Sequence, residues 1–204
     1  NEIELIKKQM KNISKKISSA RKLSKSKIQI GIESAFKNLA LKNSKIDFNL
    51  TESDEFNKNG INNIEVLYKP SEQSSPKLLS KIASGGEKSR ILFALKSILS
   101  KKIDLPTLVF DEIDSGTSGE IANAIGKMMK IMGKKIQIIA ITHLPQVASL
   151  ADYHYKVFKI EGKKNISTNI KKLDKSSRIK EIASMISGEN ITESAINQAQ
   201  ELLK

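Results

Sequence analysis

Two short apolar runs separated by a helical segment constrain the fold of this chain more than any other feature. The runs cover residues 107–110 and 136–141, and the apolar residues of 118–132 between them have helical spacing. Short strands without polar alternation are typical of parallel sheets covered on both faces. A further apolar helix is expected at 86–100. The order helix, strand, helix, strand therefore predicts a layered α/β domain with parallel strands, both of them buried.

The segments on either side of this α/β region predict antiparallel strands and helices. Before it, strands are expected at 46–50 and 63–68, with a turn at 58–60 and a Ser- and Pro-rich loop at 69–77. After it, a strand is expected at 153–160, a turn at 161–165 and a second strand that ends at 173. Two helices are expected to follow, at 177–186 and 192–203.

The first forty residues have the pattern of a coiled-coil strand that docks onto a globular body. Apolar residues recur at alternating spacings of three and four, at Ile3, Ile6, Met10, Ile13, Ile17 and Ala20. An ordinary amphipathic helix is the alternative interpretation, because the pattern is short. A broader apolar stripe follows at Ile28, Ile32, Ala35, Phe36 and Leu39. We therefore expect a coiled-coil end and docking helix over 1–42 and a globular lobe over 43–204.

Composition limits the class of partner. The chain has 35 Lys and Arg against 22 Asp and Glu, a formal charge of +13, which favours polyanionic partners. Only three of these cations are arginines, so contact with nucleic acid is expected at the phosphate backbone and not at base edges. The alternative is that most lysines lie on solvated faces. The absence of cysteine excludes disulfides and thiolate metal sites.

The end of the first apolar run carries two adjacent carboxylates, Asp111 and Glu112. Ligands of open α/β sheets bind at the carboxyl ends of the strands, which is where this pair is expected. A carboxylate pair in that place can hold a magnesium ion with one member and orient a water molecule with the other. A helix cap after a strand would use the same residue types, so the pair alone leaves both interpretations open.

Two further motifs add candidate site residues. The segment 83–90 places Ser84, Gly85 and Gly86 directly before an apolar helix, where backbone amides and the helix dipole favour a phosphate. His143 follows the second apolar run and is therefore delivered to the same sheet edge as Asp111. A plain helix cap and a structural histidine are the alternatives, but three convergent motifs favour a site.

Together these motifs resemble those of ABC-type ATPases. Residues 84–87 resemble the signature motif, 111–112 the Walker B motif with its catalytic glutamate, 114–116 the D-loop, and His143 the switch histidine. The fuller strings resemble the RecN family of bacterial DNA double-strand-break repair ATPases, in the SMC-like group, over 81–87, 110–119, 141–148, 182–188 and 191–192. Lys88 and Thr117 depart from the usual pattern at positions that carry no chemistry.

The resemblance implies ATP and Mg²⁺ as cofactors and gives three residues direct roles in hydrolysis. Asp111 would hold the magnesium ion, and Glu112 would polarise the attacking water. His143 would sense the γ-phosphate.

The resemblance also implies that two heads sandwich two nucleotides. Ser84, Gly85 and Gly86 of one head, with Glu87 of the same motif, would meet the phosphate held by the other head. Asp114 would contact the opposite head. The expected partners are therefore a second head and DNA, in the bacterial cytoplasm at the nucleoid.

One motif of such ATPases is missing. No segment of the form Gly-x-x-x-x-Gly-Lys-Ser/Thr occurs; Gly119 and Gly126 are wrongly spaced, and Met128 stands where a hydroxyl is needed. The resemblance implies that an N-terminal Walker A lobe of the same protein supplies it and that this chain is a C-terminal fragment. We therefore expect the chain alone to be inactive as an ATPase.

Three other functions fit some of these features. A different SMC-like or RecF-like DNA ATPase would share the motifs. An ABC transporter nucleotide-binding domain would share them too, but there both lobes are contiguous and no coiled coil is expected. A non-enzymatic DNA-binding module would use the positive charge alone, and the scarcity of aromatic residues disfavours base stacking.

Overall fold

The computed structural model describes residues 2–82, 85–100, 102–111, 113, 117, 119–161 and 166–204. These residues form two compact units, Asn1–Lys102 and Ile103–Lys204. The first unit contains α1 (Glu2–Phe36), β1 (Lys45–Asn57), β2 (Gly60–Lys69), β3 (Lys77–Leu78), the 3-10 turn η1 (Leu79–Lys81) and α2 (Gly85–Leu99). The second contains β4 (Thr107–Asp111), α3 (Gly119–Gly133), β5 (Gln137–Ile141), α4 (Pro145–Ala148), β6 (Tyr155–Glu161), β7 (Ile166–Lys172), α5 (Lys175–Ser187) and α6 (Glu193–Leu202).

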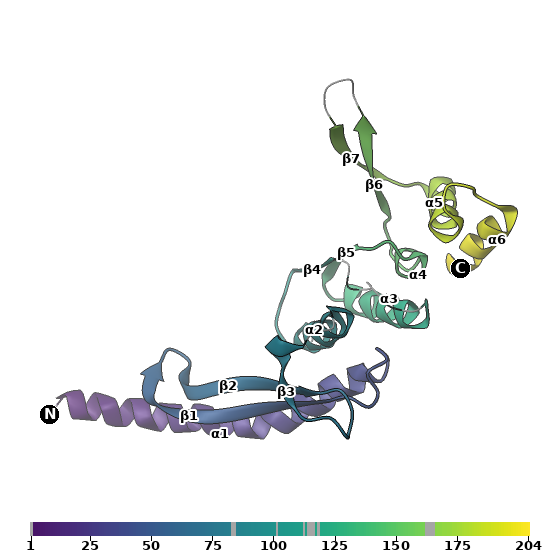
Figure 1. The fold of residues 1–204 in the computed structure, drawn as a ribbon. Helices are drawn as coiled ribbons and strands as arrows, with labels where there is room; N and C mark the ends of the chain where they lie inside the picture. Colours follow the sequence, from purple (N-terminus) through teal and green to yellow (C-terminus); the bar gives the residue numbers. More distant parts are fainter. Residues whose placement is uncertain are drawn as a thin grey trace. The chain divides into compact units, whose positions relative to one another are not determined.

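The first unit is a long helix with a β-hairpin lying along it (Figure 1). Strands β1 and β2 pair antiparallel, with Ile46 opposite Tyr68, and the short β3 adds to the edge of β2. The hairpin confirms the two predicted strands, although both are longer than the patterns indicated. The predicted docking stripe is partly confirmed, because Ile32, Phe36 and Leu39 are fully buried whereas Ile28 is 43% exposed.

The heptad stripe of α1 faces the hairpin only in part, since Ile17 lies next to Gly60 of β2. Its apolar residues are largely exposed, whereas two serines, Ser14 and Ser18, are each only 4% exposed. Small polar residues let the hairpin approach the helix closely, and the apolar stripe is left to solvent within this chain. The exposed stripe consists of Ile3, Ile6, Met10 and Ile13.

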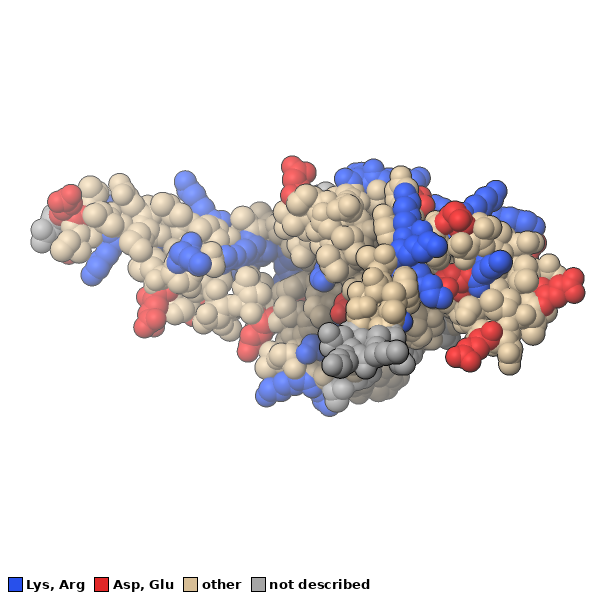
Figure 2. Space-filling view, turned by 90° about the horizontal axis from the view of Figure 1, so that it is seen from above, with Lys and Arg blue, Asp and Glu red and all other residues tan. Residues whose placement is uncertain are grey.

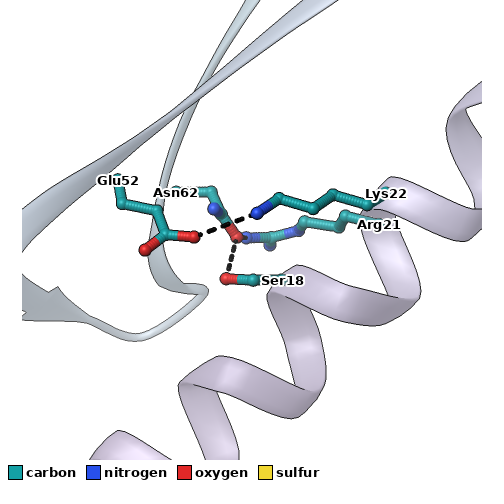
Figure 3. A network of polar contacts seen from close by, with 5 residues as sticks. All are labelled: Ser18, Arg21, Lys22, Glu52 and Asn62. Carbon is teal, nitrogen blue, oxygen red and sulfur yellow. Dashed lines mark hydrogen bonds and ion pairs between the residues drawn. The ribbon is translucent and has the colours of Figure 1, made fainter.

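The hairpin is fixed to α1 by a polar network (Figure 3). The Ser18 hydroxyl donates to Asn62 Oδ1 at 2.8 Å, and Arg21 Nη1 donates to the same oxygen at 3.1 Å. Arg21 Nη2 also donates to the carbonyl of Asn59 at 2.7 Å, in the hairpin turn. The Lys22–Glu52 ion pair at 3.3 Å is solvent-exposed and therefore adds little to stability.

In the second unit, β4 and β5 form a parallel pair joined through α3, as the sequence predicts. The pairing is in register from Thr107 opposite Gln137 to Asp111 opposite Ile141. Helix α3 buries an apolar face, and Phe110 of β4 is 1% exposed. The other face of this small sheet is open. The prediction that both strands are buried is therefore wrong on that face, where Val109, Ile139 and Ile141 are 52%, 46% and 54% exposed.

Gly126 lies inside α3, where α4 packs closely. An added Cβ there would lie 3.3 Å from the backbone oxygen of Gln146 and 2.8 Å from Leu150 Cδ1. The need for glycine at position 126 is thus explained by helix packing. This agrees with the sequence analysis, in which Gly126 does not have the spacing of a phosphate-binding loop.

The rest of the second unit is a hairpin followed by a helix pair. Strands β6 and β7 pair antiparallel. Helices α4, α5 and α6 form a small core of Ala148, Ile182, Ala183, Ala195 and Ala199. Asp174 and Thr192 cap the two helices, since their side chains accept from the amides of Ser177 and Ala195. These elements confirm the predicted strands and helices, whose starts are shifted by one or two residues.

The two compact units divide the chain at residue 102, whereas the sequence predicted a boundary at residue 42. The division at 42 concerns where a coiled-coil arm would meet its head, and it stays a prediction. Among the described residues, no helix is long and apolar enough to cross a membrane.

The Ser18–Asn62 contact gives a test of this packing. Asn62→Ala removes the shared acceptor of Ser18 and Arg21, so we expect it to lower the free energy of unfolding by about 1–3 kcal/mol. Asn63→Ala, at the exposed neighbouring position, should change it by less than about 0.5 kcal/mol. Urea unfolding followed by circular dichroism measures both, and equal effects of the two substitutions would contradict the assigned network.

Candidate active site

The carboxyl end of the β4–β5 pair carries two of the predicted site residues. Asp111 is the last residue of β4 and lies opposite Ile141, the last residue of β5. His143 follows two residues later, and both the Asp111 and the His143 side chains are exposed. The structure therefore brings Asp111 and His143 to one edge of the sheet, as expected from the sequence. Their chemical roles stay predictions.

His143 lies in a short link between β5 and α4. The amide of Leu144 donates to Thr142 Oγ1 at 3.0 Å, which closes a tight turn around His143. Helix α4 begins at Pro145, whose fixed φ suits the first position of a helix. The link between β5 and α4 is thus short and bonded at its start.

The end of α4 is held by Arg178, a residue that the sequence analysis did not single out. Its Nη2 donates to the carbonyl oxygens of Ala148 and Ser149 at 3.3 and 2.9 Å, and also to that of Ala151. Burial lowers the pKa of the Arg178 guanidinium. Burial, and next the positive charge of Arg178, also lower the pKa of His154. Arginine is rare in this chain, which is the one sequence signal that could have drawn attention to position 178.

Three predicted site residues, Ser84, Glu112 and Asp114, lie outside the described residues. Their assignments stay predictions from the sequence. Ile113, between two of them, is described and is 8% exposed.

The described part of the glycine-rich motif lies at the start of α2. Gly85 is the first residue of that helix and is exposed, and Gly86 follows. Among the described residues, no atom lies within 4 Å of the position where a Cβ on Gly85 would be. Packing within the described chain therefore does not require glycine there. A remaining reason for glycine at position 85 is that a ligand or another chain approaches the backbone closely there.

Glu87 contacts a residue that the sequence analysis assigned only to a strand. The Tyr68 hydroxyl donates to Glu87 Oε1 at 3.0 Å, and Tyr68 is 1% exposed. Ser44 Oγ lies 2.8 Å from the same hydroxyl and is its donor, since the Tyr68 hydrogen is given to Glu87; the Pro70 carbonyl, 3.1 Å from Ser44 Oγ, is the alternative acceptor for the same Ser44 hydrogen. A tyrosine at a buried strand position needs a polar partner for its hydroxyl, and this need is the sequence signal that could have pointed to such a contact.

The environment of Tyr68 keeps its hydroxyl protonated. Burial raises the pKa of Tyr68 to about 12; the Ser44 hydrogen bond opposes this shift, and the Glu87 hydrogen bond and negative charge add to it. The hydroxyl is therefore a donor to the Glu87 carboxylate over the whole physiological pH range.

No family model matches the chain, but known proteins are similar to it over nearly its whole length. It is 37% identical over 191 residues to the DNA repair protein RecN of Rickettsia bellii, which covers 94% of this chain and 35% of that protein. It is 33% identical over 196 residues to RecN of Haemophilus influenzae, covering 96% of this chain and 35% of that protein. The chain thus spans about a third of the length of these curated relatives.

Solved structures of SMC head domains share the fold. The Smc head domain with a coiled coil and joint from Pyrococcus yayanosii matches 92% of this chain and 33% of its own, with a TM-score of 0.68 and 21% identity. A chain from a structural study of ATP-driven dimerization and DNA-stimulated activation of SMC ATPases matches 85% of this chain and 99% of its own, with a TM-score of 0.57 and 20% identity. The fold is therefore that of part of an SMC head domain, mixed α/β with a long N-terminal helix.

The raised pKa of Tyr68 predicts a specific alkaline behaviour. The folded state favours the neutral phenol, so this contribution to stability is complete below pH 10 and is lost as pH rises toward about 12. Phenolate absorbance after a rapid pH jump should show a component near pH 12 that Tyr68→Phe removes and Tyr153→Phe keeps. Retention of the component in Tyr68→Phe would show that another tyrosine produces it.

Proposed function

The chain is RecN-like over nearly its whole length, and from this we propose that it is the C-terminal lobe of the head of an ATP-hydrolysing DNA-repair protein. The observation that carries the proposal is the in-register parallel pairing of β4 and β5. It supports the assignment because it sets the Walker B-like Asp111 and the switch-like His143 at one sheet edge.

The proposed chemistry assigns one task to each residue of this edge. Asp111 is an exposed carboxylate at a strand end, and carboxylate oxygens are the ligands that Mg²⁺ prefers, so this residue fits a magnesium ion bound together with nucleotide phosphates. Glu112 orients the attacking water, and His143 contacts the γ-phosphate. When bound, the ion would neutralise charge that develops on the transferred phosphoryl group.

The open face of the β4–β5 sheet supports a separate Walker A lobe as the first partner. Parallel sheets are normally covered on both faces, yet Val109, Ile139 and Ile141 are about half exposed. An N-terminal lobe of the same protein that extends this sheet would cover these side chains. It would also supply the phosphate-binding loop that the sequence lacks.

The exposed apolar stripe of α1 supports a coiled-coil partner helix. Ile3, Ile6 and Ile13 are 66%, 48% and 58% exposed on a helix of 35 residues, and a second helix packed on them would bury a seam of the predicted spacing. We propose that this helix comes from the N-terminal half of the same protein.

A second head is the proposed partner for the start of α2. The motif that contains Ser84, Gly85 and Gly86 would meet the nucleotide of the opposite head, with Asp114 contacting that head. The exposure of Gly85 supports such an approach. ATP then joins two heads, and hydrolysis lets them separate.

DNA is proposed as the substrate on which the heads act, bound through its phosphate backbone at the bacterial nucleoid. The net charge of +13 supports this. On the face seen in Figure 2, however, Lys and Arg are interspersed with Asp and Glu and form no continuous patch. The first part of α1 offers a denser group of exposed cations at Lys7, Lys8, Lys11, Lys15 and Lys16.

Glu112→Gln in the full-length protein tests the hydrolytic assignment. We expect kcat for ATP to fall by about 10²- to 10⁴-fold, because the water loses its base, while the ATP-bound dimer accumulates. Light scattering after size exclusion with ATP and Mg²⁺ measures the dimer, and Glu189→Gln on an exposed site is the control. A Glu112→Gln protein that dimerises no better than the wild type would show that the role is misassigned.

The isolated chain tests the need for the second lobe. Residues 1–204 alone should hydrolyse ATP at no more than background rate, and co-expression with the N-terminal half should restore turnover. Measurable hydrolysis by residues 1–204 alone, abolished by Glu112→Gln, would defeat this part of the proposal.

A further inference from the structure

The residue that links the hairpin to the glycine-rich motif is Tyr68. It lies at the end of β2, nineteen positions before Glu87, which is the third residue of α2. Its ring is buried and contacts Phe36 edge to face, with centroids 6.3 Å apart and an interplanar angle of 85°. The ring is thus held on one side by the end of α1, and its hydroxyl is directed at the first turn of α2.

The hydroxyl is held from both sides. Ser44 Oγ lies 2.8 Å from it and donates to it, because the hydrogen of the phenol is given to Glu87. The phenol therefore cannot turn away without breaking its contacts with both Ser44 and Glu87. On the other side Glu87 Oε1 accepts from it at 3.0 Å. Hydrogen bonds to charged acceptors are stronger than neutral ones, and burial increases their strength further. Tyr68 therefore ties the first turn of α2 to a rigid strand.

Gly85, two positions before Glu87, has no side chain that could hold the start of the helix. A Cβ on Gly85 would meet no described atom within 4 Å, so the space beside this residue is open on that side. The next side chain of α2 that anchors the turn to another element is that of Glu87. A displaced first turn would move the amides of Gly85 and Gly86 together with it.

We propose that Tyr68 is a positioning residue for nucleotide-dependent joining of two heads. Its hydroxyl fixes Glu87, and through Glu87 it holds the amides of Gly85 and Gly86 where a phosphate bound by the opposite head can be met. Glu87 then acts through the backbone of its own turn and not by touching the nucleotide. This inference rests on the proposed function, since it presupposes a phosphate presented by a second head.

The test uses the full-length protein and separates nucleotide binding from head joining. Tyr68→Phe keeps the ring and its packing on Phe36 but removes the donor. We expect the ATP concentration for half-maximal dimerisation to rise on the order of tenfold, the effect of losing one hydrogen bond to a charged group. Binding of a fluorescent ADP analogue to the monomeric head should stay unchanged, because the other lobe holds it.

Two further variants distinguish positioning from general damage. Tyr155→Phe removes a hydroxyl from an exposed tyrosine and should leave dimerisation as in the wild type. Glu87→Ala breaks the same bond from the other end, so it should weaken dimerisation, and adding Tyr68→Phe to it should produce no further loss. If Tyr68→Phe folds poorly, Glu87→Ala alone still tests the bond, because it leaves the buried ring of Tyr68 intact.

The outcomes separate this inference from the function beneath it. Tyr68→Phe that dimerises at the wild-type ATP concentration, or additive losses in the double variant, would overturn the positioning role alone. A wild-type protein that does not dimerise with ATP would overturn the proposed function and the positioning role with it.

Discussion

Two parallel strands cannot be joined by a tight turn, and in this chain the crossover between β4 and β5 is α3. That requirement fixes the geometry on which the site depends. The helix packs on one face of the pair, and the in-register ladder then sets both carboxyl ends at one edge. Asp111 and His143, thirty-two positions apart, share an edge because the connection leaves no other arrangement for them.

The same small sheet would explain why the proposed lobe needs a second one. Helix α3 covers one face of the two-stranded sheet. On the other face the apolar side chains of Val109, Ile139 and Ile141 stay half exposed. In a protein that folds around this pair, the free energy gained by covering them joins the second lobe to the first. The surface that needs cover therefore belongs to the same strands that carry the proposed catalytic residues, so docking of the other lobe and completion of the site would occur together.

Much of this arrangement could be predicted because it is local. The periodicity of 107–110, 118–132 and 136–141 gave the α/β order, and strand ends gave the placement of Asp111 and His143. The contacts of α1 with the hairpin were predicted only in part. Phe36, a member of the predicted stripe, packs against Tyr68, but Ser18 bonds Asn62, and hydrophobic periodicity does not detect such a polar contact. The Tyr68–Glu87 bond was missed for a related reason: it joins two segments whose pairing depends on tertiary packing. The open sheet face was missed because an apolar strand pattern does not reveal which chain covers it.

A binding surface that is already ordered loses less conformational entropy when its ligand arrives. The glycine-rich turn needs this more than most segments, because glycine gives the backbone freedom and no described side chain lies within 4 Å of the position where a Cβ on Gly85 would be. A bond from a flexible, exposed side chain would add its own loss of rotamer freedom on ordering. Tyr68 avoids that loss, because its ring is already immobilised against Phe36. In the proposed dimer the strand β2 would thus contribute to nucleotide engagement without reaching the nucleotide.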